Sequence, residues 1–264
     1  MQPLISIVTV TLNAGGDLAR TCRSVSKQLS GNIEHIIKDG ISRDDSLNGL
    51  ELHPSHRIVV RRDSGIYDAM NQALEVASGK FVWFLNAGDE LIGPHACQWV
   101  GQKLESGECN IVYGDYLNVF RNVIVRQPKR LTNFYLYRQV LCHQSVIMEA
   151  ELIRKASGFA TAYCIRADQE LFLRIWRSGV AKTVHSGRVL IGYKDNGYST
   201  WKANRNMGAA ELRQLRQVHF SRTERVVYGL LLMATVPGIR QFLLRVGKGR
   251  FSRIYTWVAN QLNR

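Results

Sequence analysis

Polar side chains stand directly after four short apolar stretches in the first 90 residues, and several of them are acids. The stretch Phe81–Leu91, FVWFLNAGDEL, is the most informative, because an aromatic-rich run ends in Asn86 and Asp89. Carboxylates in such a place can hold a divalent cation or accept a proton. A turn alone would also use Asn, Gly and Asp, so this stretch by itself does not distinguish a site from a turn.

The same arrangement recurs after the other apolar stretches. Because the carboxyl ends of parallel strands meet at one edge of a sheet, polar residues at all four ends indicate one ligand site. No GxxxxGK[ST] or GxGxxG loop follows any of these stretches. Phosphates of a ligand would therefore be held most simply by a divalent metal on a carboxylate. The polar residues in question are Thr11, Asn13, Asp39, Asp63, Asn86 and Asp89.

The order of the elements predicts an α/β domain with a mostly parallel sheet. Strands are predicted at 4–10, 34–38, 57–61 and 81–85, each a short β-branched or aromatic run. Asp17 is placed to cap a helix that ends near Leu29, and a second helix runs from Ile66 to about Ala77. Asp44 and Asp45 are interpreted as a solvated helix start.

The second half of the domain contains one further acid that could do chemistry, Asp168. It begins an amphipathic helix, where an acid is also favoured by the helix dipole, so a general base and an ordinary helix start are both open. His143 and Gln144 interrupt an otherwise apolar strand. The remaining elements predicted here are a helix at 95–105, a strand at 110–114 and a β-hairpin at 116–130.

Composition and charge describe a globular chain with a basic tail. The 264 residues are 45% apolar and 21% charged, and the five cysteines are scattered singly, as expected of free thiols in a reducing compartment. The formal net charge is +14, and Trp201–Arg264 holds 12 Lys or Arg against two acids, Glu211 and Glu224. Such a tail indicates an anionic partner, either phospholipid or nucleic acid.

Taken together, the motifs resemble the family 2 glycosyltransferases, and most of all bacterial members that build exopolysaccharide and O-antigen chains. The likeness runs from Pro3 to Ser199 through SIVTVTLN, IIKDGISRDDS, RRDSGIYDAMNQAL, ASGKFVWFLNAGDEL, CHQ and ADQELFLR. It implies a GT-A (Rossmann-like) α/β fold over residues 1–200. The composition of the tail predicts a basic, amphipathic helical extension over 201–264. The resemblance also implies a nucleoside-diphosphate sugar donor, with UDP or GDP, and an inverting transfer to a hydroxyl of a saccharide.

The resemblance assigns the nucleotide end of the site. By position, Thr11 and Asn13 would line the nucleotide pocket, and Asp39 would hydrogen-bond the base. The motif that helps to hold the ribose and diphosphate supplies Asp63, Asp68 and Asn71.

At the diphosphate end, Asp89 matches the metal-binding acid of the family's DxD motif. Mn²⁺ or Mg²⁺ is the implied cofactor. The residue two positions before Asp89 is Ala87 rather than an acid, so Asn86 is the nearest other polar group and is assigned to the nucleotide-sugar site. With one clear acid, strict metal dependence is less assured than in the family's usual form.

The reacting end follows from the same resemblance. Asp168 is placed as the general base, whereas Glu170 is expected to face away on the same helix. His143 and Gln144 are expected to face the donor phosphates or the acceptor. Asn196–Ser199 occupies the place of a family loop near the active site, for which a mobile lid is the hypothesis.

The tail and the first residues carry the expectations about location. The opening MQPLISIVTV looks like a first strand rather than a secretion signal. The uncharged run 226–239 is short for a membrane span, and Ile239–Leu262 mixes Arg with aromatic residues, as in an interfacial helix. We expect a peripheral protein on the cytoplasmic face of the inner membrane, with a lipid-linked acceptor. Packing of the tail on the body, or a dimer contact, is the alternative.

Two other functions compete with glycosyl transfer. A nucleotidyltransferase would want a basic, glycine-rich loop after the first strand, and Leu12–Asp17 has glycines but no Lys or Arg. A nucleic-acid-binding module would explain the basic tail but leaves the acids after the strands without a purpose. We therefore expect no nucleic-acid partner.

Overall fold

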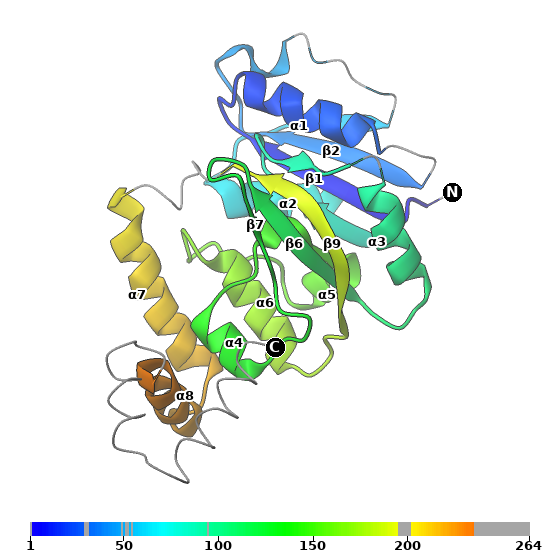
Figure 1. The fold of residues 1–264 in the computed structure, drawn as a ribbon. Coiled ribbons are helices and arrows are strands. Elements are labelled where there is room, and N and C mark those ends of the chain that lie inside the picture. Colours follow the sequence, from blue (N-terminus) through cyan, green and yellow to red (C-terminus); the bar gives the residue numbers. More distant parts are fainter. Residues whose placement is uncertain are drawn as a thin grey trace.

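A twisted nine-stranded sheet runs through the molecule, with helices on both of its faces (Figure 1). The structure is a computed structural model that describes residues 2–28, 32–48, 50, 53, 55–93, 95–194 and 202–234. The strand order is β3-β2-β1-β4-β8-β6-β9-β5, with β7 on β6. The strands are β1 Ile5–Thr11, β2 Ile33–Asp39, β3 His56–Val60, β4 Phe81–Phe84, β5 Glu90–Leu91, β6 Ile111–Asn118, β7 Val123–Val125, β8 Val146–Glu149 and β9 Thr183–Tyr193.

The sheet is mostly parallel, as predicted. Each of the four parallel ladders, which join β3, β2, β1 and β4 in turn and β6 to β9, has more paired residues than any of the antiparallel ones. The helices are α1 Gly16–Ser26, α2 Ile66–Val76, α3 Ala96–Glu105, α4 Asn133–Arg138, α5 Ala150–Lys155, α6 Ala167–Arg177, α7 Lys202–His219 and α8 Arg222–Ala234. Two single turns of 3₁₀ helix, η1 Asp45–Leu47 and η2 His143–Ser145, complete the set.

Alternation along the strands builds two cores. Successive side chains of a strand point to opposite faces, so both faces of a central strand must be apolar. In β1, Val8 packs with α2 on one face, whereas Ile7 packs with α3 on the other. Strand β4 shows the same alternation, with Phe84 in the first core and Trp83 in the second.

Most predicted elements are confirmed within one or two residues. The predicted hairpin is also present, but β6 runs without a break from Ile111 to Asn118 and β7 ends at Val125, five residues before the predicted end. The prediction that Asp17 caps α1 is wrong. Gly15 is the N-cap and no side chain caps that end, while Asp17 lies inside the first turn and pairs with Lys194. Gly79 is required for another reason than a helix end, because a Cβ there would lie 2.5 Å from the backbone nitrogen of Ser6.

The two acids of the basic tail attach it to the body of the protein. Glu211 in α7 accepts hydrogen bonds from the backbone N–H groups of Cys164, Ile165 and Arg166. Glu224 in α8 pairs with Arg177 through both oxygens, at 2.8 and 3.0 Å. Both helices therefore pack beside α6 and α4 (Figure 1).

Some predictions fall on residues outside the described ranges. These are the lid loop Asn196–Ser199 and the interfacial helix Ile239–Leu262. Among the described helices, none has the length and apolarity needed to span a membrane.

Candidate active site

A long cleft opens along the carboxyl edge of the parallel strands. It consists of three adjoining hollows of about 470, 570 and 340 Å³. The first two share Ile66, Tyr67 and Cys164, and the last two share Leu12 and Asp63, so the hollows form one trough. Asp89, His143 and Asp168 line its first hollow, and Thr11, Asp63 and Asp68 its second.

Asp89 sits at the floor of the first hollow, just after β4. Its side-chain oxygens accept hydrogen bonds from the backbone N–H of Lys194 at 2.9 Å and from Gln144 Nε2 at 3.1 Å. Its carbonyl accepts from Thr21 Oγ1, which fixes the turn on α1. Burial raises the pKa of Asp89 to about 6, because the charged form is poorly solvated there. A bound cation would relieve that cost.

The residues around Asp89 fit a hard divalent cation. Asn86 lines the same hollow, and its side-chain oxygen is buried without a hydrogen-bond partner among the described residues. A carboxylate and an amide oxygen are ligands that Mg²⁺ and Mn²⁺ prefer, and such ions take their other ligands from water and substrate phosphates. Asp89 and Asn86 would therefore hold the metal, which is the reading given to Asp89 by the resemblance.

Asp168 lies at the start of α6 and is fixed by two side chains. Its Oδ2 is 3.0 Å from His143 Nδ1, and its Oδ1 is 3.0 Å from the Tyr67 hydroxyl. That hydroxyl also lies 2.8 Å from the Ile165 carbonyl, so its one proton can serve either acceptor. Burial tends to raise the pKa of Asp168, but the hydrogen bond and charge of His143 outweigh it and lower the pKa below its usual value. Asp168 is thus an ionised carboxylate at neutral pH.

The pair His143-Gln144 joins the two acids. The turn η2 presents His143 toward Asp168, while the next residue, Gln144, bonds Asp89. Trp83 Nε1 donates to the Gln144 carbonyl at 2.6 Å and so fixes this turn on β4. The far ring nitrogen of His143 is 3.5 Å from Asn86 Nδ2, which links the metal side to the base side. Neighbouring residues of one short turn therefore set the relative position of both carboxylates.

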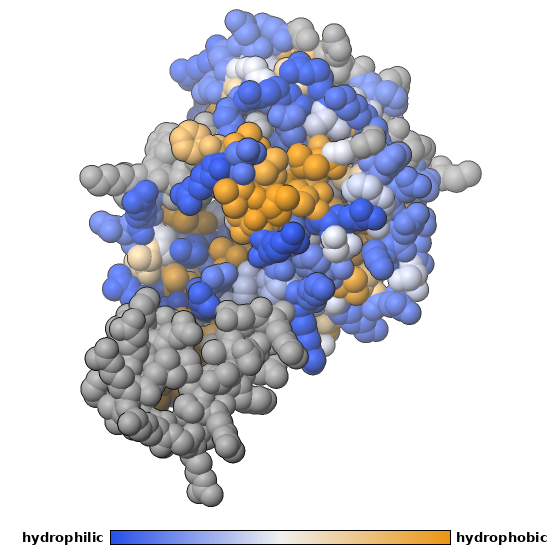
Figure 2. Space-filling view, in the orientation of Figure 1, coloured by the Kyte–Doolittle hydropathy of each residue, from blue (hydrophilic) through white to orange (hydrophobic). Residues whose placement is uncertain are grey.

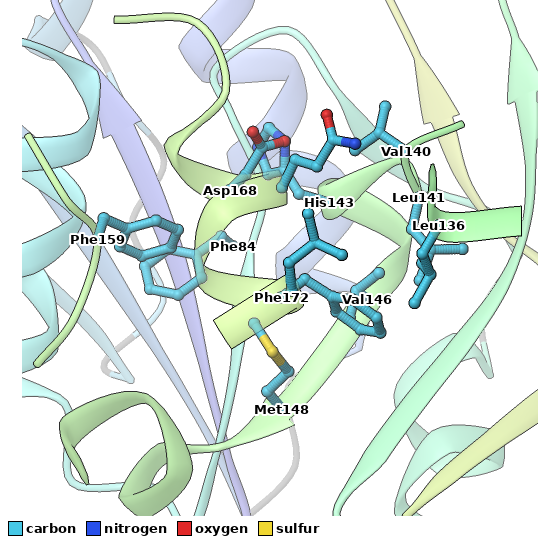
Figure 3. Close-up of a pocket in the computed structure, with 12 residues that line it drawn as sticks. Phe84, Leu136, Val140, Leu141, His143, Val146, Met148, Phe159, Asp168 and Phe172 are labelled. Atoms are coloured by element: carbon cyan, nitrogen blue, oxygen red, sulfur yellow. The ribbon is translucent and has the colours of Figure 1, made fainter. Parts of the chain in front are cut away.

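An apolar wall lies behind the Asp168–His143 pair. Figure 3 shows Phe84, Phe159, Phe172, Val146 and Met148 gathered beneath the two polar side chains. The space among them is about 20 Å³, room for roughly one water molecule. Asp168 therefore lies between the first hollow of the cleft and this apolar wall.

At the other end of the trough, the expected nucleotide residues divide into two groups. Thr11, Asn13, Asp63 and Asp68 line the second and third hollows, and Thr11 Oγ1 is buried without a partner. Asp68 accepts hydrogen bonds from the Ser64 backbone and side chain, which closes the first turn of α2 and lowers its pKa. This end is lined by the residues that the resemblance assigned to nucleotide and ribose.

The structure brings neither Asp39 nor Asn71 to the cleft in the part of the chain that it describes. Asp39 is fully buried and accepts hydrogen bonds from the backbone and hydroxyl of Ser42. The Asn71 side chain bonds both the carbonyl and the N–H of Phe159, and thereby joins α2 to the loop before α6. Asp44 caps η1, in agreement with its interpretation as a helix start.

Lys38 is a buried cation that the sequence analysis missed. Its Nζ donates to Asp63 Oδ2 at 2.8 Å and to the carbonyls of Asp39 and Arg61, and its side chain is 0% exposed. The ion pair fixes the loop after β3 that carries Asp63 into the trough. Asp63 alone would be left as a nearly buried, unpaired charge.

Lys38→Met is therefore expected to lower the free energy of unfolding by about 3–5 kcal/mol, the usual cost of breaking a buried pair. Urea unfolding with an unchanged m-value measures this. Glu75→Gln is the matched control, since the Arg61–Glu75 pair is more than half exposed and its loss is expected to cost under about 1 kcal/mol. Equal effects of the two substitutions would contradict the role of Lys38.

Several further residues of the first hollow escaped the sequence analysis. Tyr67 lies in the GIYDAMN motif but was not assigned to the site. Arg166, Lys194 and Arg205 add positive charge to the wall of the hollow, and Lys194 Nζ is held by Asp17. Glu211 of α7 also lies near the site, since it accepts a hydrogen bond from the backbone N–H of Arg166, two residues before Asp168. The sequence signal for this residue was that acids are rare in the basic tail.

Comparisons with known proteins agree with this geometry. The model of glycosyl transferase family 2 matches residues 6–165. An uncharacterized glycosyltransferase of Mycobacterium tuberculosis is 35% identical over 181 residues, which is 65% of this chain and 68% of that protein. A UDP-Glc:alpha-D-GlcNAc-diphosphoundecaprenol beta-1,3-glucosyltransferase of Escherichia coli is 25% identical over 205 residues, 72% of this chain and 77% of the relative.

Among solved structures, the fold is similar to that of a mannosyltransferase from Pyrobaculum calidifontis, solved in complex with GDP-Man and Mn²⁺. The TM-score is 0.64 at 16% sequence identity, with 100% of this chain and 81% of the other covered. Likeness at that identity shows the fold, which is the expected GT-A fold. Since the family model spans more than half of the residues and a relative above 30% identity supports it, this chain belongs to glycosyl transferase family 2.

Proposed function

We propose that the protein is a metal-dependent, inverting glycosyltransferase. It would transfer the sugar of a UDP-sugar or GDP-sugar to a hydroxyl of a lipid-linked saccharide in bacterial surface polysaccharide synthesis. The observation that carries the proposal is the His143-Gln144 bridge, which holds two buried acids of opposite pKa shift in one cleft. Two carboxylates with separate environments suit separate tasks. We assign Asp89 to the binding of a cation, and the ionised Asp168 to the acceptance of a proton.

In this mechanism Asp168 accepts the proton of the acceptor hydroxyl as its oxygen attacks the anomeric carbon. Asp168 is suited to this because it is ionised and because His143 and Tyr67 fix its position. His143 Nδ1 donates to Asp168 and keeps the carboxylate in place, and Asp168 becomes a neutral carboxylic acid when it accepts the proton. A single in-line displacement by the hydroxyl inverts the anomeric centre.

The departing nucleoside diphosphate needs charge stabilisation on the other side of the sugar. The cation at Asp89 and Asn86 would supply Lewis-acid stabilisation of that leaving group. Arg166, Lys194 and Arg205 line the same hollow and can add to it. The second and third hollows, with Thr11, Asn13, Asp63 and Asp68, are the proposed seat of the nucleoside.

Two observations favour a lipid-linked acceptor. The E. coli relative is named for transfer from UDP-Glc to a GlcNAc on diphosphoundecaprenol, and part of this chain's own surface is apolar and basic. Figure 2 shows apolar surface gathered over β6, β7 and β9. The hairpin of β6 and β7 exposes Val119, Phe120, Val123 and Ile124. The backbone N–H of Val119, the first residue after β6, donates to the carbonyl of Tyr193, which lines the first hollow.

Helix α8 exposes a second apolar stripe. Val226, Leu230 and Met233 recur at helical spacing and are each about half exposed, and Arg222 begins the same helix. We propose that this stripe, the hairpin and the basic residues of 201–264 seat the protein on the cytoplasmic face of the inner membrane. In this reading, residues 1–200 form the catalytic domain and 201–264 an accessory extension.

The intact protein is expected to co-sediment with vesicles that contain phosphatidylglycerol at moderate salt, and not with vesicles of phosphatidylcholine alone. Phe120→Ser is expected to weaken this binding about tenfold, since burying an aromatic side chain in the interface contributes about 1.4 kcal/mol or more. Val180→Ser, at another exposed valine outside the hairpin and the stripe, is the control and should leave binding unchanged. Absence of binding to anionic vesicles would refute the membrane proposal.

Product analysis tests the reaction itself. Purified protein with Mn²⁺ is incubated with a panel of UDP- and GDP-sugars and undecaprenyl-diphosphate saccharides, and NMR of the product gives its anomeric configuration. Inversion with one donor is the expected result. A product that keeps the donor's configuration, or a nucleotide transferred to a sugar phosphate, would overturn the proposal.

A further inference from the structure

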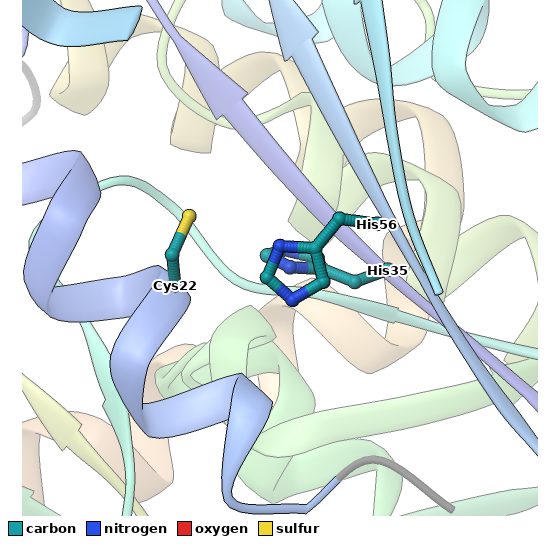
Figure 4. Close-up of side chains that lie close together, drawn as sticks. All are labelled: Cys22, His35 and His56. Atoms are coloured by element: carbon teal, nitrogen blue, oxygen red, sulfur yellow. The ribbon is translucent and has the colours of Figure 1, made fainter. Parts of the chain in front are cut away.

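A cluster of potential metal ligands lies apart from the cleft, between α1 and the β3 edge of the sheet. Cys22 on α1, His35 on β2 and His56 on β3 each offer one ligand atom, and these atoms lie within 4.8 Å of one another. Figure 4 shows the thiol beside the two imidazole rings, and the planes of these rings are nearly perpendicular. None of the three residues lines the hollows of the cleft in the described part of the chain.

Among the described residues, each of the two imidazoles has a hydrogen-bond partner on one nitrogen only. His35 Nε2 lies 2.8 Å from Thr9 Oγ1, and His56 Nε2 lies 3.3 Å from Ser26 Oγ. The Nδ1 atom of each ring is buried without a partner. A neutral imidazole with its proton on Nε2 presents a bare lone pair at Nδ1, and a proton on Nδ1 would be buried without an acceptor. Leaving such an atom unmatched is costly, so a ligand for Nδ1 is to be expected.

The chemistry of the three groups favours a borderline-soft ion. Thiolate and imidazole are the usual ligands of Zn²⁺, whereas Mg²⁺ and Mn²⁺ prefer oxygen. The oxygen ligands at Asp89 and the sulfur and nitrogen ligands here therefore select different metals.

We propose that Cys22, His35 and His56 form a structural Zn²⁺ site that joins α1 to the edge of the sheet. From Zn–N and Zn–S bond lengths of about 2.0 and 2.3 Å, tetrahedral ligand atoms lie roughly 3.3–3.6 Å apart, so a shift on the order of 1 Å completes the geometry. Binding releases the thiol proton to solvent. His53, whose ring centroid is 6.3 Å from that of His56, supplies a candidate fourth ligand.

Such a site would brace the nucleotide end of the trough from behind. The loop before α1 carries Asn13, and the loop after β3 carries Asp63, which both line the trough. In the part of the chain that the structure describes, the edge strand β3 is paired with β2 alone. A metal that holds His56 to Cys22 would give this strand a second attachment.

Cobalt titration of the full chain tests the site. The protein is stripped with a chelator under reducing conditions and titrated with Co²⁺, which gives a thiolate-to-cobalt charge-transfer band only when a cysteine is a ligand. One equivalent of Co²⁺ is expected to produce the band, and Zn²⁺ is expected to abolish it by displacement. At a 100-fold excess over Kd, Zn²⁺ should also raise the Tm by about 5–10 °C.

Variants decide which residues are responsible. Cys22→Ala and His56→Gln are expected to abolish the band, and Thr9→Val, which removes the partner of His35, should weaken affinity about tenfold or more. Cys97→Ala, at another buried cysteine, is the matched control and should retain the band. No band in the wild-type protein would overturn the proposal whether or not the variants fold, and so would a band that survives in Cys22→Ala.

Discussion

Replacing Asp168 with Asn is expected to lower kcat by about 10³-fold, in the middle of the range for loss of a general base. The substitution keeps the shape of the side chain and leaves an amide near Tyr67 and His143, but it cannot accept the hydroxyl proton. Nucleotide affinity should stay within about twofold, because Asp168 lies in the first hollow and the nucleoside is proposed to lie in the second and third. Steady-state turnover with the identified donor and calorimetry with its nucleoside diphosphate measure the two quantities.

Glu170→Gln is the matched control for this prediction. Glu170 stands on the same helix but pairs with Arg174 and His219, away from the cleft, as the sequence analysis predicted. Its loss is expected to change kcat less than about threefold. An Asp168→Asn enzyme with near-normal turnover would show that the base lies elsewhere, and equal losses in both variants would indicate a structural effect.

Replacing Asp89 with Asn is expected to remove metal-assisted nucleotide binding and to lower kcat/KM by about 10²–10³-fold, which corresponds to roughly 3–4 kcal/mol. Among the described residues that line the first hollow, Asp89 is the one acid besides Asp168, and the Asn86 oxygen alone cannot balance the cation's charge. Asp115→Asn is the control, since Asp115 is also buried but bonds Gln127 and His185. Unchanged metal dependence in Asp89→Asn would refute the assignment.

The pH dependence of metal binding follows from the raised pKa of Asp89. The metal binds the ionised carboxylate, and with a pKa of about 6 that form is lost as the pH falls below 6. Apparent metal affinity should therefore be flat above about pH 7 and fall about tenfold per pH unit below 6. Raising the Mn²⁺ concentration should move this limb to lower pH, because cation and proton compete. Calorimetry between pH 5 and pH 8 measures both effects, and an affinity that stays flat through pH 5 would contradict the role of Asp89.

Sequence patterns were sufficient to predict the strands of the first half of the chain. Apolar runs predicted β1, β2 and β4, since strands buried on both faces must be largely apolar, and the short β-branched run predicted the more exposed strand β3. Asp89 and Asp168 could be singled out because each stands at the end of a strand or the start of a helix. The pairing of β8 with β4, and of β9 with β6, could not be read in this way, because long-range register leaves no local signal.

Side-chain partners that appear only in the folded chain could not be predicted from the sequence. Asn71 and Asp39 were assigned to the nucleotide by position, and in the structure their side chains bond Phe159 and Ser42. Lys38 lies in a buried strand, where a cation is unexpected until its three oxygen partners are seen. The bridge from His143 to Asp168 and from Gln144 to Asp89 spans 25 and 55 residues, so only the folded chain displays it.

Isothermal titration with UDP and with GDP, each with and without Mn²⁺, tests the central claim most directly. One of the two nucleotides should bind the wild-type protein at least tenfold more tightly with Mn²⁺ than without it, and this difference should vanish in Asp89→Asn while it persists in Asp168→Asn. Failure of both nucleotides to bind in the presence of Mn²⁺, or a metal effect that survives in Asp89→Asn, would contradict a nucleotide-sugar site built on Asp89.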